Sequence, residues 1–447
     1  MTRPLVPPHS PYGTVCRFVV QQHFDGWLIY RRRLGRRVPK YVRKAFRKYL
    51  KCGDPRHGFS VLACPTQHYS RYVAYRCKGR GFCTYCLLIR QRTLAAQLID
   101  RVIGNVPVRH AVLCFPPALR FVIGYDKELL KGAFAVLAEA MFNHQRRLAV
   151  ELFNVPPDRV HPGGAEVAHR ASASLATNHH VHGIFPDGVF ILLQDGTLEF
   201  RRLSPPSEDQ IAAIAHEACV AFCAVLKRCG FWTTTTVSTD SVEGQLTLPK
   251  RSSRPTKFFG QAAKDAEGGV APIGGAYAFH VFIGNAIEVE ERPQLEQLVN
   301  YILAPPFLDH QVSLDDQSNV VLDLKRARHN GATRVVLKPF EFLDRLAELV
   351  SRPKANTVRY FGVYAPRARL RRRAIALRVG NPGPARVRRG PELCPICGKE
   401  LRVVAEVKGS GGTPDAIPPD TPENGSPRDQ DRMDDRTTYD RQGRLFG

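Results

Sequence analysis

Apolar residues recur every three to four positions in several stretches of the chain, and this spacing predicts helices with one buried face. These stretches cover residues 41–51, 94–106, 126–152, 208–229, 291–303 and 339–350. Apolar runs bounded by turn residues predict strands at residues 108–115, 276–283, 319–325, 333–337 and 358–364. Both helices and strands are therefore expected in this chain.

The most informative strand candidate covers residues 177–185 and contains His180 and His182. A Pro-Asp-Gly turn and a second apolar run at 189–193 follow it, which together predict a β-hairpin. Successive strand side chains point to opposite faces, so the two histidines share a face and can hold one divalent cation between them. Two ordinary strand histidines are the alternative. A cation would need a further ligand, for which the candidates are Glu166, His169 and Asp187, the last of which also suits the turn.

The charge of the chain indicates a nucleic-acid partner. Lys and Arg outnumber Asp and Glu by 65 to 41 in the 447 residues, which gives a formal charge of +24. An excess of this size favours nucleic acid as partner. The predicted helix at 41–51 contains no acid, so its basic residues are either a solvated face or, as we favour, phosphate contacts. These candidate DNA-binding residues are Arg43, Lys44, Arg47 and Lys48.

No apolar run reaches the length of a membrane span, and the N-terminus lacks the apolar core of a signal peptide. The sequence therefore predicts a cytoplasmic protein without a membrane partner, in which the 12 cysteines are reduced. Close cysteines in such a chain are candidate zinc ligands or, alternatively, a group of buried thiols. The expected tetrahedral Cys3His zinc site comprises Cys64, His68, Cys83 and Cys86, with Cys77 as the reserve ligand.

Two further features belong to the cysteine pattern. Lys78 and Arg80 lie beside the Cys83 knuckle, as expected if a zinc fold presents cations to DNA. Cys394 and Cys397 form another CxxC knuckle, but no second CxxC follows it. The second knuckle is therefore either a half-site completed elsewhere in the chain or no metal site at all.

Tyr301 lies at the polar margin of the predicted helix at 291–303. A tyrosine there can be half-buried packing, or it can present its hydroxyl to a cleft. Two histidines on one face of a strand and a tyrosine from a separate helix are a combination of residues suited to a nuclease active site. A metal would polarise the scissile phosphate, and the Tyr301 phenolate would attack phosphorus to leave a 3′-hydroxyl and a 5′-phosphotyrosine.

Several ordered motifs carry a family resemblance. They are Cys52-Gly53-Asp54 with His57-Gly58-Phe59, the Cys77–Cys83 segment, His180-Val181-His182 with Pro186-Asp187-Gly188, Leu298-Val299-Asn300-Tyr301 before Pro305-Pro306, and Tyr360-Phe361-Gly362-Val363-Tyr364-Ala365-Pro366. From about Pro39 to Gly398 the chain resembles the HUH rolling-circle transposases of bacterial insertion sequences, of the insertion-sequence common-region type. Two departures stand out: Gln67 replaces a cysteine of the zinc pattern, and Gln297 and Pro305 leave Tyr301 without a second tyrosine one turn away.

The resemblance implies an α+β fold, with a small zinc-binding N-terminal domain followed by an HUH-type catalytic domain, an antiparallel sheet flanked by helices. We expect an N-terminal arm at 1–38, the zinc-binding domain at 39–105, the catalytic domain at 106–375, a basic segment with the knuckle at 376–404 and a disordered tail at 405–447. His180 and His182 would hold Mg²⁺ or Mn²⁺, and Tyr301 would be the nucleophile.

These implications describe a bacterial, nucleoid-associated transposase that nicks and rejoins single-stranded DNA at the ends of its element, with Zn²⁺ as a structural ion. A rolling-circle replication initiator or relaxase would use the same site. A non-catalytic, zinc-dependent DNA-binding protein is the alternative of a different class, and it would bind DNA without any covalent adduct.

Overall fold

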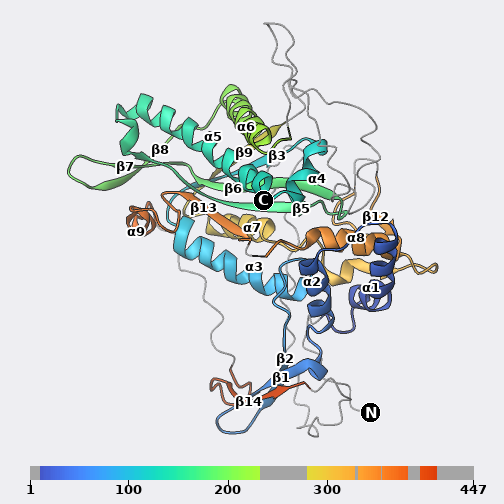
Figure 1. The fold of residues 1–447 in the computed structure, drawn as a ribbon. Helices are drawn as coiled ribbons and strands as arrows, with labels where there is room; N and C mark the ends of the chain where they lie inside the picture. Colours follow the sequence, from blue (N-terminus) through green and yellow to red (C-terminus); the bar gives the residue numbers. More distant parts are fainter. Residues whose placement is uncertain (1–10, 232–278, 328–330, 354, 381–392, 410–447) are drawn as a thin grey trace.

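The computed structural model describes residues 11–231, 279–327, 331–353, 355–380 and 393–409. Figure 1 shows a central sheet with helices on both faces, a helical block beside it and a small sheet that projects from one end. This arrangement confirms the α+β class and the antiparallel sheet flanked by helices. The predicted strand residues 276–278 lie outside the described part of the chain.

The helical block forms around a core that includes Trp27, Phe46 and Phe342. Its elements are α1 (Val15–Arg33), α2 (Lys40–Leu50), α8 (Pro339–Leu349), η5 (Asp309–Gln311) and the sheet of β10 (Val312–Leu314), β11 (Val320–Asp323) and β12 (Arg334–Leu337). The expectation of an N-terminal arm at 1–38 is wrong for α1, since the Trp27 Nε1 donates a hydrogen bond of 2.8 Å to Asp344 and the helix packs on α8. Residues 1–10 lie outside the described part.

The central sheet has five strands, and each pairs with its neighbours in antiparallel fashion. Their order is β13 (Val358–Gly362), β5 (Gly163–Ala171), β6 (Thr177–Pro186), β3 (Val108–Cys114) and β9 (His280–Ile287). One face packs on α4 (Pro117–Tyr125), α5 (Lys127–Phe153) and α6 (Glu208–Arg228). The other packs on α3 (Thr84–Leu98), η2 (Ile99–Ile103), α7 (Arg292–Ile302) and α9 (Arg371–Ala376).

The predicted hairpin after His182 is wrong. Strand β7 (Gly188–Leu192) does not pair with β6 but joins a separate sheet with β4 (Val160–His161), which follows η3 (Pro157–Arg159), and β8 (Leu198–Arg202). The side chain of Asp187 is buried between the two sheets, where Arg109 donates a hydrogen bond to it and Arg202 lies 2.8 Å away. Asp187 therefore fixes a bend at which the chain passes from one sheet to the next.

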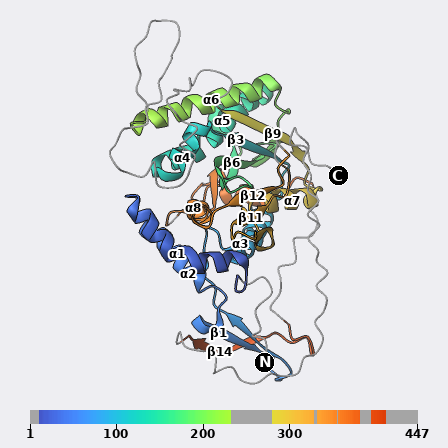
Figure 2. The same cartoon turned by 90° about the vertical axis from the view of Figure 1, so that its right-hand side faces the viewer.

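The projecting sheet joins distant parts of the chain. Strands β1 (Gly58–Ala63), after η1 (Pro55–His57), and β2 (Ser70–Ala74) form a hairpin, and β14 (Arg402–Lys408) pairs with the other edge of β1. Figure 2 shows this sheet apart from the helical block. The expected disordered tail at 405–447 is therefore wrong for its first residues, because 405–408 belong to β14. Residues 410–447 lie outside the described part of the chain.

Helix α3 begins ten residues before the predicted 94–106 helix; Cys83 is its N-cap residue, and Arg90, Gln91 and Arg92 interrupt the apolar period of the added turns. Among the described residues, α6 is long and apolar enough to cross a membrane by length and composition alone. That is weak evidence, since Phe222 and Leu226 of α6 pack into the core shared with α5 and the central sheet. A capping box at Ser207 and Gln210 starts this helix.

Candidate functional site

Three histidines meet on the face of the central sheet that packs against α7. His169 on β5 pairs directly with His180 on β6, so their side chains lie on the same face, and His182 shares that face two residues on. One ring nitrogen from each histidine lies within 4.8 Å of the others. The sequence pattern predicts the His180–His182 pair, and the strand register adds His169 as the third member.

The other two candidates for the third ligand point elsewhere. Glu166 pairs with Arg359 across strands, and Arg359 lies over the ring of Phe134 on α5, on the opposite face of the sheet. Asp187 is engaged by Arg109 and Arg202. Of the three candidates, only His169 therefore joins the histidine cluster.

A hydrogen bond orients each of the three rings. The Nδ1 of His180 lies 2.8 Å from the carbonyl of Asn178, and the Nε2 of His169 lies 2.6 Å from the carbonyl of Ile302. The Nδ1 of His182 lies 2.9 Å from the Nε2 of His110 on β3. A ring nitrogen that donates to a carbonyl carries a proton, so the other nitrogen keeps its lone pair for a metal.

Burial keeps these histidines neutral. It lowers the pKa of His180 to about 4, with a further lowering from His169, and it lowers the pKa of His182 well below the ordinary value. The pKa values of His169 and His110 are also lowered by burial, the latter to about 4. Neutral imidazole is the form that binds a metal ion.

The cluster fits a divalent cation. The Nε2 of His182 is buried and has no hydrogen-bond partner. Leaving a buried polar atom unpaired costs free energy, and a metal ion bound to this nitrogen would remove that cost. Three protein ligands leave a coordination position for a further group, as in catalytic sites. Three imidazole donors are more typical of a transition-metal site than of a Mg²⁺ site.

Tyr301 lies at the edge of the cluster. Its ring stands nearly perpendicular to that of His182 with the centroids 5.8 Å apart, and 47% of the residue is exposed. Burial of the remainder raises the pKa of the phenol, an effect that the positive charge of Arg326 opposes. A side chain that is half-buried against the cluster and half-exposed can meet a substrate from solvent.

The backbone on both sides of Tyr301 is held by side chains. The last carbonyls of a helix have no partner within the helix, and here Gln91 of α3 donates to the carbonyl of Asn300 at 2.6 Å. His169 donates to the carbonyl of Ile302. The tyrosine is therefore fixed from the side of the histidine cluster and from the side of α3.

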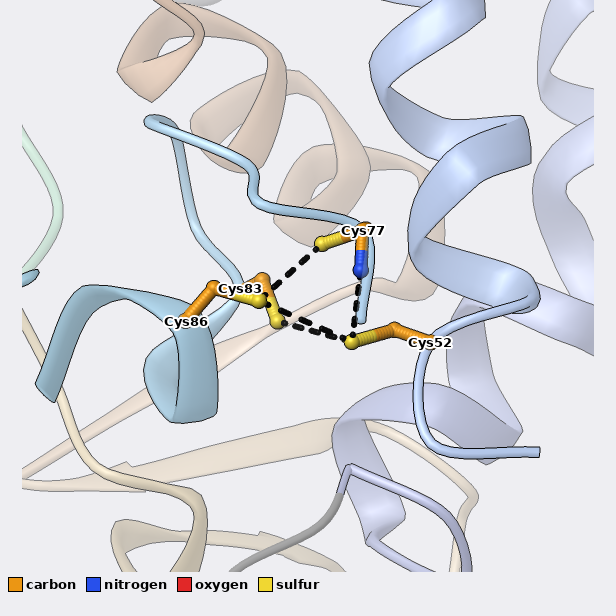
Figure 3. A group of neighbouring side chains, drawn as sticks. All are labelled: Cys52, Cys77, Cys83 and Cys86. Atoms are coloured by element: carbon orange, nitrogen blue, oxygen red, sulfur yellow. Dashed lines mark hydrogen bonds between the residues drawn. The ribbon is translucent and has the colours of Figure 1, made fainter. Parts of the chain in front are cut away.

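A group of four cysteines lies where α2, the β2–α3 connection and the start of α3 meet. Figure 3 shows Cys52, Cys77, Cys83 and Cys86 with their sulfurs turned toward one another. The sulfur of Cys52 lies 3.7 Å from those of Cys83 and Cys86, and the sulfur of Cys77 lies 3.5 Å from that of Cys86. Such S–S separations are close to the roughly 3.8 Å edge of a tetrahedral zinc–thiolate site.

Two family models match the chain. A model described as "Putative transposase" covers residues 163–372, and a transposase zinc-binding domain covers residues 19–115. The two matched regions do not overlap; the four-cysteine group lies in the second and the three histidines in the first. The chain therefore contains a putative transposase domain preceded by a transposase zinc-binding domain. No curated protein and no solved structure matches it.

The transposase carries its four-cysteine group inside the matched zinc-binding domain, but not with the expected composition. The structure divides the predicted set, because Cys83 and Cys86 lie with Cys52 and Cys77, whereas Cys64 and His68 belong to a second group. The expected single site of Cys64, His68, Cys83 and Cys86 is therefore wrong as a grouping. The reserve residue Cys77 does belong to the first group, and Cys52, which has no CxxC spacing, completes it.

The basic residues of the transposase lie as expected on its surface. Arg43, Lys44, Arg47 and Lys48 are exposed on α2, opposite its buried residues Val42, Phe46 and Tyr49. Lys78 and Arg80 are also exposed beside the cysteine group, and the guanidinium of Arg80 donates to the carbonyl of Ala355 at 2.6 Å. Sequence reasoning did not identify His110 and Gln91, which lie on other elements and share no spacing with the sites that they support.

Proposed function

We propose that this transposase nicks and rejoins single-stranded DNA through a 5′-phosphotyrosine on Tyr301. The observation that carries the proposal is the position of Tyr301: its ring stands edge-on to His182, and the carbonyls on both sides of it are held. A nucleophile aligned in this way loses little conformational freedom when substrate binds.

The reaction begins with the phenol in its neutral form, because burial raises the pKa of Tyr301. The phenol gives up its proton to water as its oxygen bonds to phosphorus, the bond from phosphorus to the 3′ oxygen breaks, and that oxygen takes up a proton from water to leave as a 3′-hydroxyl. A cation at the three histidines would polarise a phosphate oxygen and neutralise the charge that develops. Attack by another 3′-hydroxyl on the phosphotyrosine reverses these steps and joins two strands.

A side chain and two backbone carbonyls hold the three histidine rings in place. His110 fixes the ring of His182, while Asn178 and Ile302 fix those of His180 and His169 through their carbonyls. The exposed Arg and Lys side chains of α2 supply contacts to DNA phosphates, and such contacts carry no sequence information. DNA binding through these basic side chains should weaken steeply as the salt concentration rises.

The test uses labelled single-stranded DNA from the ends of the element with Mn²⁺ or Mg²⁺. We expect label to stay on the protein in a denaturing gel, and to be lost in Tyr301→Phe and His180→Ala. The matched control is Tyr30→Phe, which removes the hydroxyl of a similarly exposed tyrosine on α1. Tight, salt-sensitive binding without an adduct on any end sequence would instead support a non-catalytic DNA-binding protein.

A further inference from the structure

We propose that Cys64, His68, Cys394 and Cys397 form a second zinc site that ties the C-terminal strand β14 to the β1–β2 hairpin. Their ligand atoms lie within 4.8 Å of one another, and the sulfurs of Cys64 and Cys397 are 3.3 Å apart. A Cys3His set suits tetrahedral zinc. The site shares no residue with the four-cysteine group, and its two C-terminal ligands lie outside both matched regions of the chain.

Each pair of ligands is presented by a tight backbone turn. Both turns begin with Cys-Pro. The N–H of Gly398 donates to the carbonyl of Cys394 at 2.9 Å, and the N–H of Gln67 donates to the carbonyl of Cys64 at 2.8 Å. Gly398 has a φ of 68° and Gln67 a φ of 56°, and the second value is uncommon for a residue with a side chain. The strained turn at Gln67 brings His68 to the position of a ligand.

Thr66 connects the ligands of the site. Its hydroxyl lies 3.0 Å from the sulfur of Cys64, 3.6 Å from that of Cys397 and 3.2 Å from the Nδ1 of His68. A hydroxyl among thiolates can donate a hydrogen bond to one of them and stabilise its charge, which is a common arrangement around metal ligands.

Apolar burial alone does not explain why β14 docks. The apolar cluster at this end of the projecting sheet has Cys64, Cys394 and Leu401 as its buried members, and every residue of β14 is exposed. Docking also brings together two segments that are 333 positions apart in the sequence, which has an entropic cost. Small sheets with so little core commonly need a metal or a disulfide, and zinc binding supplies folding free energy directly.

The first test counts zinc in the full-length protein purified in the presence of zinc. The measurements use His180→Ala/His182→Ala as the background, so that zinc in the histidine cluster is not counted. We expect Cys394→Ser/Cys397→Ser to lose one zinc ion per chain and to keep one at the four-cysteine group. The matched control is Cys219→Ser/Cys223→Ser, a cysteine pair on α6 outside both groups, which should lose none.

The second test follows the C-terminal strand itself. Limited proteolysis with mass analysis should release β14 from Cys394→Ser/Cys397→Ser, while the helical block and central sheet stay intact. His68→Ala should lose the same zinc ion, and His68→Cys should retain it. Unchanged zinc content in Cys394→Ser/Cys397→Ser would overturn the proposal, and so would a Cys64–Cys397 disulfide found by alkylation and mass analysis of the zinc-loaded protein.

Discussion

The four-cysteine group and the histidine cluster are both candidate metal sites, yet they are built differently. The cysteine sulfurs face one another inside the large core of the helical block, and Cys52 is fully buried. The three histidines lie at the face of a sheet, each oriented by a hydrogen bond, with the half-exposed Tyr301 beside them. Four ligands close a site, whereas three leave a position open.

This difference indicates what each site contributes. A closed thiolate site can only add folding free energy, because no position remains for substrate. An open site with neutral, preoriented imidazoles contributes little to folding but can bind a reacting group. Helix α3 connects the two sites. Cys83 and Cys86 lie at its N-terminus, and its Gln91 donates a hydrogen bond to the carbonyl of Asn300 on α7, next to Tyr301. Helix α3 therefore links the four-cysteine group to the backbone beside Tyr301, the proposed nucleophile.

The largest expected effect is on folding. Cys83→Ser/Cys86→Ser removes half of the closed ligand set from the core around Phe46 and Phe82. Structural zinc sites contribute on the order of 10 kcal/mol, so the helical block should no longer unfold cooperatively. Thermal unfolding followed by circular dichroism measures this effect. A variant that keeps the melting temperature of the wild type would show that the closed site does not stabilise the fold.

The open site should show the reverse pattern. His182→Ala should reduce adduct formation by about 10³-fold or more, which is about 4 kcal/mol of barrier, and should leave the melting temperature nearly unchanged. Adduct yield with labelled DNA and a thermal melt are measured on the same sample. His280→Ala is the control, since His280 pairs with Cys114 on the neighbouring strand but is exposed and outside the cluster. Equal losses in both variants would contradict a specific role for the cluster.

A carboxyl group at the junction of the two regions should give a pH-dependent effect. Glu348 of α8 accepts a hydrogen bond from Thr177 at the start of β6, and burial raises the pKa of Glu348 to about 7. Between its ordinary pKa of 4.5 and pH 7, the folded state keeps a proton that the unfolded state has lost. The free energy of unfolding therefore falls as pH rises through this window and levels off above it.

The Glu348→Gln variant removes this titration. Relative to wild type, it should gain about 2 kcal/mol of stability between pH 5 and pH 8, with the gain complete by about pH 8. Denaturant unfolding at the two pH values measures the difference. A gain of the same size at both pH values would show that the effect comes from packing and not from the charge of Glu348.

The sequence predicted part of each site, and in both cases for the same reason. His180 and His182 are two residues apart on one strand, so the period of a strand places them together without any tertiary information. Cys83 and Cys86 are likewise local. Their partners come from elsewhere: His169 through the β5–β6 register, and Cys52 through the packing of α2 against the start of α3. Local spacing does not contain that information.

The errors have the same origin. The Asp-Gly turn after His182 is an ordinary hairpin signal, but the buried ion pairs of Asp187 with Arg109 and Arg202 make it a passage between two sheets. The zinc set was wrong because Cys64 and His68 find their partners at Cys394 and Cys397, more than three hundred residues later. The elements were predicted well where apolar periodicity is strong, as in α2, α5 and α7.

The smallest expected effect tests the link between the two regions. Gln91→Met removes the hydrogen bond to the carbonyl of Asn300 and keeps a side chain of similar length. The misplacement of Tyr301 should reduce the rate of adduct formation by about 10-fold to 100-fold, without loss of metal from either site. Single-turnover nicking and metal content measure the two quantities separately. Gln294→Met on the exposed start of α7 is the matched control, because its amide bonds only Glu291 of the same helix turn. If Gln91→Met nicked DNA at the wild-type rate, the cysteine region would not position the tyrosine. The cysteine site would then act in folding and the histidine site in catalysis, each independently of the other.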